Sequence, residues 1–409
     1  MVFDRVPDVA GATSSRKRPS VRPPSRGASR TVRPLLLGAI VVAMGWQTGL
    51  ADEPAAAAEP VRGEAPASIT FTSWTGPYMR SQMLGFVRPY EEETGALVHV
   101  SHYDGGIDEI RDQVESANVV WDVVDLTQAD SIRACEEGLL ESLEGIELPE
   151  GADGTPFEED FVDGALNDCG VGVIVWATAF ASANGAFDGA MPTTIADFFD
   201  TETFPGARAI RDDPTVVMEW ALIADGVPPE EVYATLETSE GVERALTKME
   251  SLRPGLRLWR NGREPIRLLN AGDVVMSSIW ATTGAVASRE PEADFSIVWH
   301  GRVIELDLFG IPKGTRDLEA AVDFIRYASG SEALARMVEH LPNGPARQSS
   351  LALVSDEVRR QLPNSPALED KLTIRSDAEW WAAHHARLEE VFDAWLELTP
   401  RKGASGTVR

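Results

Sequence analysis

The sequence predicts an α/β protein of two lobes, in which each lobe is a mainly parallel sheet flanked by helices. Strand-like and helix-like segments alternate from Ser68 to Gly138, which is typical of βα units and a doubly wound sheet. A second set of strands and helices follows between residues 193 and 299. At 409 residues the chain is long enough for two hydrophobic cores.

The first lobe begins with three repeats of strand and helix. Gly95 and Gly138 lie where helices are expected to end, because glycine adopts the left-handed conformation there without strain. A long apolar run then predicts a buried strand. The expected elements are strand 69–74, helix 78–93, strand 96–102, helix 106–117, strand 120–126, helix 128–137 and strand 170–181.

The second lobe is expected from residue 183, with a helix that starts at a threonine cap. Its expected elements are helix 193–200, strand 207–211, helices 214–225, 228–237 and 239–251, strands 255–259 and 274–280, helix 281–289, and strands 295–299 and 303–309. Helices are expected at 317–329, 331–340, 355–361 and 376–397.

Two extended crossings, near 181–184 and 303–308, are expected to form a hinge between the lobes. The predicted division is 68–182 plus 305–345 for the first lobe and 183–304 plus 346–397 for the second. Ligand sites favour interfaces between domains, and hinge closure around a ligand is a common motion.

The segment 1–51 is predicted to be a secretory signal, with a basic start, a short apolar run from Leu35 to Trp46 and small residues after it. An uncleaved membrane anchor is the alternative. Residues 52–67 are expected to be a flexible spacer, and 398–409 a disordered tail. We therefore expect a periplasmic protein. Its formal net charge of −28 argues against nucleic acid and anionic lipid surfaces as partners.

The chain has two cysteines, Cys135 and Cys169. In an exported protein such a pair favours a disulfide bond, although two buried free thiols are the alternative.

Sequence motifs of common enzymes are absent from the chain: it has no G-x-S-x-G, no G-x-x-x-x-G-K-[ST] and no H-E-x-x-H. The six histidines are scattered, so we expect no metal site and no cofactor. Glu305 and Asp307 lie on one face of a predicted strand, and Asp213 precedes Pro214 at an expected helix start. These carboxylates are candidates for binding an ammonium group, whereas helix capping or an exposed strand face are the structural alternatives.

Trp74 and Trp280 both end predicted strands. A tryptophan ring attracts organic cations, so two rings from opposite lobes could enclose an alkylamine or a planar ligand. Burial in the core is the alternative for each ring. A pair of these carboxylates could also catalyse glycoside hydrolysis, which leaves a secreted hydrolase as a rival function.

Over about 69–396 the chain resembles the spermidine/putrescine-binding proteins of ABC importers, in the extracellular solute-binding group. The resemblance rests on the order and spacing of short motifs. These are Ser73-Trp74-Thr75, Pro89–Gly95, Trp121–Leu126, Glu137–Leu140, Val175–Thr178, Thr193–Phe199, Asp212-Asp213, Met276–Trp280, Asp307 and Ile311–Gly314.

The resemblance implies a two-lobed periplasmic-binding-protein fold that closes on a solute and delivers it to an inner-membrane ABC permease, acting as a monomer and not as an enzyme. It implies that the ligand-binding positions of the family fall on Trp74, Thr127, Asp213, Trp280 and Asp307. A polyamine-like cation is the ligand expected first.

This sequence departs from the family pattern at several positions. Ala129 and Val216 stand where the family has a tyrosine and a glutamate, Glu305 replaces a tryptophan, and Tyr78 lies one residue beyond the family's position. Glu305 thus joins the candidate site as a gained carboxylate. These changes leave an opine or another amino-acid derivative as an alternative ligand, and a chemoreceptor as an alternative partner.

Overall fold

The computed structural model describes residues 67–397. The predicted signal segment 1–51, the spacer up to residue 66 and the predicted tail 398–409 lie outside the described residues. Of the described helices, none is long and apolar enough to cross a membrane.

The described residues form one mixed sheet of eleven strands, eight of them in the order β2-β1-β3-β9-β5-β8-β6-β7. The other three pair at the side of this order: β4 and β10 pair with β5, and β11 pairs with β9. The strands at each end are parallel, as predicted, whereas the two central strands run antiparallel to their neighbours. The strands are β1 (Ser68–Ser73), β2 (Leu97–His102), β3 (Val123–Thr127), β4 (Leu166–Asn167), β5 (Gly170–Ala183), β6 (Arg208–Arg211), β7 (Arg257–Trp259), β8 (Met276–Trp280), β9 (Phe295–Gly310), β10 (Gly344–Pro345) and β11 (Thr373–Arg375).

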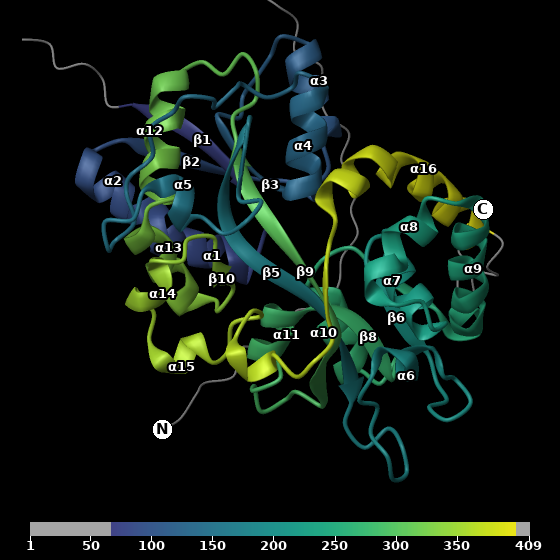
Figure 1. Ribbon diagram of the computed structural model, residues 1–409. Helices are drawn as coiled ribbons and strands as arrows, with labels where there is room; N and C mark the ends of the chain where they lie inside the picture. Colours follow the sequence, from purple (N-terminus) through teal and green to yellow (C-terminus); the bar gives the residue numbers. More distant parts are fainter. Residues whose placement is uncertain (1–66, 398–409) are drawn as a thin grey trace, which may run out of the picture. The chain divides into compact units, whose positions relative to one another are not determined.

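Helices flank both ends of this sheet (Figure 1). Around β1–β3 lie α1 (Pro77–Gln82), α2 (Arg88–Thr94), α3 (Asp108–Glu115), α4 (Gln128–Glu136), α5 (Phe157–Asp160), α12 (Leu318–Ala328), α13 (Ser331–His340), α14 (Ser350–Leu353) and α15 (Asp356–Arg359). Around β6–β8 lie α6 (Ile195–Phe199), α7 (Val217–Ala224), α8 (Val232–Leu236), α9 (Ser239–Met249), α10 (Arg263–Asn270), α11 (Ala281–Ala287) and α16 (Ala378–Glu397).

The long strands β5 and β9 connect the two halves of the sheet. Val171–Val175 of β5 pack in the core of the β1–β3 half, whereas Phe180 packs in the core of the β6–β8 half. On β9 the same change occurs between Leu306 and Val303. The strand order and the separate cores give the two-lobed α/β architecture that the sequence predicts.

Two details of the predicted division differ from this packing. Residues 295–299 and 303–309 belong to one continuous strand, β9, rather than to two. Ala346 and Val354 pack in the first core, although 346–397 was assigned to the second lobe; the later residues Ile374 and Trp381 do pack in the second core. The chain therefore returns to the second lobe later than the sequence predicts.

The predicted helix 78–93 is interrupted by a π-helical turn at Met83–Val87. Pro89 has no N–H, so it cannot donate to the carbonyl of Gly85 four residues earlier. Arg336 of α13 donates to that carbonyl instead, at 2.9 Å. A Cβ on Gly85 would lie 2.6 Å from Met337, so this glycine lets the two helices approach closely. Sequence analysis also missed α10, which begins directly after the loop 260–262.

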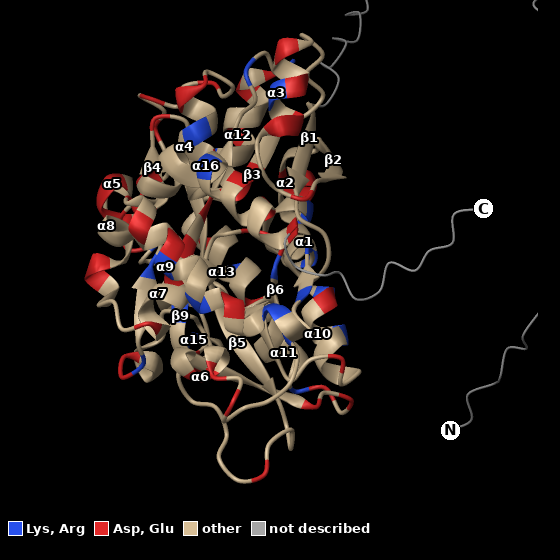
Figure 2. Cartoon of the chain, turned by 90° about the vertical axis from the view of Figure 1, so that its right-hand side faces the viewer, with Lys and Arg blue, Asp and Glu red and all other residues tan. Residues whose placement is uncertain are grey.

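Acidic side chains are spread over most of the described elements, and basic ones are fewer (Figure 2). Figure 2 shows several lysine or arginine positions near α10 and α11. These basic residues stand out because acidic residues outnumber basic ones in the chain, 65 to 37.

Candidate functional site

A cavity of about 730 Å³ lies at the carboxyl ends of strands from both halves of the sheet. Trp74 follows β1, Thr127 ends β3, Arg211 ends β6 and Trp280 ends β8, and all four line it. Ligands of open α/β sheets collect at such strand ends. The volume lies in the usual range for small-molecule pockets, about 300–1,000 Å³.

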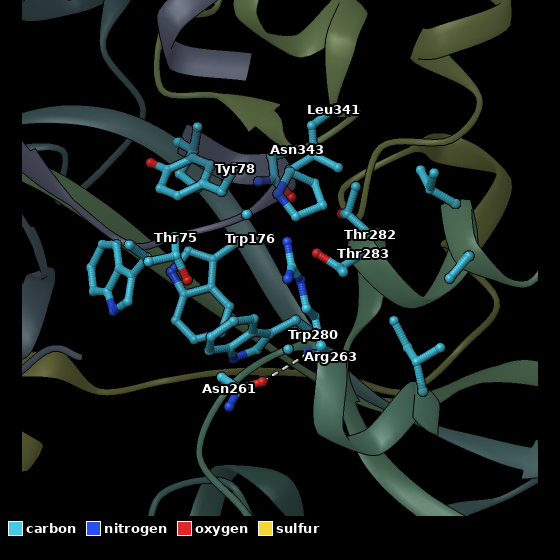
Figure 3. A pocket seen from close by; sticks show the side chains of 18 of the residues that line it. Thr75, Tyr78, Trp176, Asn261, Arg263, Trp280, Thr282, Thr283, Leu341 and Asn343 are labelled. Atoms are coloured by element: carbon cyan, nitrogen blue, oxygen red, sulfur yellow. Dashed lines mark hydrogen bonds between the residues drawn. The ribbon is translucent and has the colours of Figure 1, made fainter. Parts of the chain in front are cut away.

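Aromatic rings form much of the wall (Figure 3). Trp74, Tyr78 and Tyr103 come from the first half, and their rings lie near one another, with centroids 5.5 Å apart for Trp74 and Tyr103. Trp176 of β5 and Trp280 of β8 complete the wall. The predicted site residues Trp74 and Trp280 thus lie at the ends of strands and line this cavity.

A glycine backbone lies against each of the two predicted tryptophans. A Cβ on Gly105 would be 3.3 Å from Trp74 Nε1, and a Cβ on Gly262 would be 2.6 Å from the Trp280 ring. Larger residues would push these rings out of position, so both glycines help to fix the indoles at the cavity.

Asp307 supplies a carboxylate to the cavity from β9, where it pairs with Thr127 of β3. It is 4% exposed, and its Oδ1 accepts a hydrogen bond from Trp176 Nε1 at 2.8 Å. Burial first, and then the nearby charges of Asp125 and Glu305, raise the pKa of Asp307 well above its ordinary value. This carboxylate is thus poorly solvated and available to a cationic ligand group.

Positive groups line the same cavity from the second half. Arg211, Arg260 and Arg263 all contribute, together with Asn261. Arg260 already pairs with Asp212, at 2.6 Å. No hydrogen bond or ion pair within residues 67–397 engages the guanidinium of Arg211, so its donors are free for a ligand. Figure 3 shows the side chain of Arg263 extending past Trp280 toward Thr283.

Asp213 and Glu305, two predicted ligand-binding residues, do not line this cavity. Asp213 accepts a hydrogen bond from Thr215 N at 2.8 Å and pairs with His385 of α16. Burial is the largest single influence on Asp213 and raises its pKa. The positive charge of Arg211 and the hydrogen bond and charge of His385 together outweigh it, so the pKa falls below its ordinary value. Glu305 is held among other acids, and burial, only partly offset by Arg211, raises its pKa to about 8.

The local chain path explains why Asp213 is turned away. The sequence predicted that Pro214 begins a helix, but α7 begins at Val217. A tight turn comes between them, with Val217 N donating to Thr215 O at 2.8 Å and Val216 at φ 72°. This three-residue turn is rare and is strained for a β-branched residue. The local sequence has no glycine or asparagine at position 216 that would predict it.

Three important residues were not among the sequence candidates: Trp176, Arg211 and Asp125. Trp176 lies in the Val175–Thr178 motif and Asp125 in the Trp121–Leu126 motif, so both positions were visible but unassigned. Arg211 directly precedes the Asp212-Asp213 pair, in which the sequence predicted a ligand-binding carboxylate and no role for the arginine. Its position at a strand end was the available signal.

Cys135 of α4 and Cys169, just before β5, form a disulfide bond, with Cα atoms 5.8 Å apart. It fastens α4, which follows the Thr127 side of the cavity, to the start of the long strand β5. The predicted bridge is therefore present. Within the described residues, no group of three or more His, Cys, Asp or Glu side chains is placed to hold a metal ion.

Comparison with known proteins agrees with this architecture. Residues 85–367 match the model of the bacterial extracellular solute-binding protein family. The γ-aminobutyric acid-binding protein of Pseudomonas aeruginosa is 34% identical over 80% of this chain and 90% of its own length. The putrescine-binding periplasmic protein PotF of Escherichia coli is 28% identical over 32% of this chain and 40% of its own length.

Among solved structures, the binding protein MotA of A. tumefaciens B6 in complex with glucopine is similar, with a TM-score of 0.74 and 25% identity. That likeness covers 80% of this chain and 99% of MotA. The Atu4243 GABA receptor is similar with a TM-score of 0.70 and 25% identity, over 80% of this chain and 97% of that one. The matched family model and the long Pseudomonas relative show that this chain belongs to the bacterial extracellular solute-binding proteins, which bind small molecules and deliver them to ABC permeases.

Proposed function

We propose that this protein captures a small zwitterion, with an ammonium group and a carboxylate, in the cavity between its two lobes. Short ω-amino acids and opines are ligands of this class. The observation that carries the proposal is that Asp307 and the free guanidinium of Arg211 line one cavity from opposite lobes.

The two ends of the cavity would recognise the two ends of the ligand. The ammonium group would bind Asp307 and lie among the rings of Trp74, Trp176 and Trp280, where charge-assisted hydrogen bonds and cation–π attraction act together. The carboxylate would bind Arg211, whose planar fork matches a carboxylate in two hydrogen bonds.

A polyamine-like cation was the first expectation from the sequence. The arginines that line the cavity oppose a second ammonium group at that end, because like charges repel in a poorly solvated site. The names of the relatives support the same choice, since they include a γ-aminobutyric acid-binding protein and a glucopine complex as well as a putrescine-binding protein. We therefore favour the zwitterion over the diamine.

Closure would follow from the ligand touching both lobes, since it binds the closed arrangement better than the open one. The closed protein would then deliver the ligand to an ABC permease outside the cytoplasm. A bridged Cys135 and Cys169 support an oxidising compartment of this kind.

The test is a matched panel of four-carbon ligands that differ only in their end charges. γ-Aminobutyrate carries one charge of each sign, putrescine carries two positive charges, and succinate carries two negative ones. We expect γ-aminobutyrate, or an opine added as a larger zwitterion, to raise the melting temperature most. A ligand at about 100 times its Kd adds about 2.7 kcal/mol to the stability. A shift with putrescine alone would show a polyamine-binding protein instead.

A further inference from the structure

A second buried carboxylate, Asp125, lies beside Asp307 beneath the cavity. On the antiparallel strands β3 and β9, Thr127 pairs with Asp307 and Asp125 pairs with Phe309. Asp125 and Asp307 are therefore diagonal neighbours on one face of the sheet, at about 7–8 Å between Cα atoms, a separation at which two poorly solvated charges act on each other. Their exposed fractions are 0% and 4%.

Only neutral groups hydrogen bond to these two carboxylates. Oδ2 of Asp125 accepts from Ser73 Oγ at 3.1 Å, from the Tyr78 hydroxyl at 2.8 Å and from Gln82 Nε2 at 2.5 Å. Its Oδ1 is buried and accepts no hydrogen bond from the part of the chain that the structure describes. Asp307 accepts from the indole of Trp176. Among residues 67–397, no lysine, arginine or histidine pairs with either carboxylate.

Two buried carboxylates without a cation cannot both ionise easily. Burial raises the pKa of Asp125 to about 7, although its three hydrogen bonds act in the other direction. Burial and the charge of Asp125 raise the pKa of Asp307 as well. Such a pair titrates as a unit, in which the loss of the first proton opposes the loss of the second.

The surrounding ionisable groups do not supply the missing positive charge. From α1 and from the segment after β2, the hydroxyls of Tyr78 and Tyr103 face the pair, and their own pKa values are raised by burial first and by these acids. From β9, Glu305 adds negative charge to the environment of Asp307. The charge of Asp130 of α4 likewise raises the pKa of Tyr103 and of Glu305. Arg211 of β6 lowers the pKa of Glu305.

We propose that Asp125 and Asp307 share a proton in the ligand-free protein, and that the ammonium group of the ligand displaces it, so that capture of the ligand releases a proton to solvent. The charge of the buried pair and its guest is then the same before and after binding: a proton leaves as one ammonium charge enters. Asp125 is accordingly a residue that tunes affinity through Asp307 without touching the ligand. This inference rests on the proposed function, because it requires a ligand with an ammonium group.

The exchange makes affinity depend on pH in a definite direction. An ammonium group favours the ionised pair, so binding lowers the pKa of the shared proton. Below that pKa in the free protein, each unit of pH that is lost weakens binding by up to about tenfold, since a proton must be removed for each ligand bound. Above it the affinity becomes independent of pH.

The test is calorimetric titration with γ-aminobutyrate at about pH 6, in two buffers with different ionisation enthalpies, whose difference in heat counts the protons released. We expect up to about one proton per ligand in the wild type. In Asp125→Asn, the like charge next to Asp307 is gone, so the release should fall markedly while binding remains. Asp163→Asn, an exposed acid remote from the pair in sequence, should behave as wild type. Equal heats in both buffers for the wild type would overturn the proposal.

A spectroscopic measurement keeps the test decisive if Asp125→Asn does not fold. The infrared difference spectrum between the ligand-free and the ligand-bound wild type at neutral pH should show the loss of one protonated carboxylic acid band when γ-aminobutyrate is added. The protonated forms of Glu219 and Glu305, whose pKa values are also raised, are present in both states and cancel in the difference. Butyrate, which keeps the carboxylate and lacks the ammonium group, should leave the band in place. Failure of every zwitterion to bind refutes the proposed function, whereas binding without loss of this band refutes the proton exchange alone.

Discussion

His385 and Asp213 form an ion pair, with 3.5 Å between Nε2 and Oδ2, that ties helix α16 to the segment following β6. Both side chains are about one-fifth exposed. Burial acts first and lowers the pKa of His385, but the hydrogen bond and charge of Asp213 outweigh it and raise the pKa above its ordinary value. The pair holds Asp213 in a structural role next to Arg211, rather than in the cavity.

This ion pair predicts a pH-dependent stability. Because the pKa of His385 is raised in the folded state, its contribution is fully present below about pH 6.5, the ordinary histidine value, and is lost as pH rises through the folded pKa. We expect the free energy of unfolding of His385→Gln to vary less with pH than that of the wild type from pH 6.5 upwards. Urea unfolding at several pH values measures this. A slope as steep as that of the wild type would assign the pH dependence to another group.

Glu219 should show linkage of the same sign as His385 but over a lower pH range, since its pKa is also raised in the folded state. It is fully buried and accepts hydrogen bonds from Trp381 at 2.8 Å and Tyr233 at 3.1 Å. Burial raises its pKa to about 7. The unfolded state therefore releases its proton first, and stability falls between about pH 4.5 and pH 7.

The substitution Glu219→Gln removes this proton and keeps the shape of the side chain. We expect the variant to be more stable relative to wild type at pH 8 than at pH 4, with the change falling between those values. Thermal unfolding followed over that range provides the measurement, and a constant difference between the two proteins would contradict the assignment.

Asp307→Asn should weaken the binding of any ligand with an ammonium group. The variant keeps an acceptor for Trp176 but removes the charge, and a hydrogen bond to a charged group contributes about 1.5–3 kcal/mol, which is about 10- to 100-fold in Kd. Calorimetry with γ-aminobutyrate gives the value. An affinity within twofold of wild type would remove Asp307 from the site.

Arg211→Met should weaken the binding of ligands that have a carboxylate and should not weaken the binding of ligands that lack one. We expect the affinity for γ-aminobutyrate to fall by about 10- to 100-fold, again on the strength of charged hydrogen bonds, while that for putrescine is kept or increased. Arg257→Met, at an exposed position of β7 outside the cavity, is the matched control. Parallel losses for both ligands would show that Arg211 supports the fold instead of reading the carboxylate.

Loss of the disulfide should destabilise the protein without changing the ligand-binding residues. The bridge closes a loop with a sequence separation of 34. On the chain-entropy model this stabilises by about 3–4 kcal/mol. We expect Cys135→Ala/Cys169→Ala to lower the melting temperature in non-reducing buffer, and a reducing agent to bring the wild type toward the variant. Equal melting temperatures would show that the bridge has no such effect.

The local pattern of the sequence predicted most elements of the fold because strand and helix periodicities depend on near neighbours. It predicted that Trp74 and Trp280 lie at the ends of strands. The strands β1 and β8 run in opposite directions, and their carboxyl ends meet at the cavity only because they come from the two facing halves of the sheet. The hydrogen bond from Arg336 to the Gly85 carbonyl in the π-helical turn at Met83–Val87 was not predictable in this way, since the two residues are 251 positions apart in the chain.

The sequence by itself determined the βα order, the two cores, the tryptophans at strand ends and the pairing of two cysteines, all through periodicity, composition and count. Only the tertiary structure decided which charges face the ligand cavity. It turned Asp213 toward His385 through a strained turn at Val216, left the guanidinium of Arg211 without a hydrogen bond to any of residues 67–397, and set Asp125 beside Asp307 through the register of β3 and β9. The physical reason is that the charge environment of a side chain depends on contacts between distant segments, which local sequence does not encode.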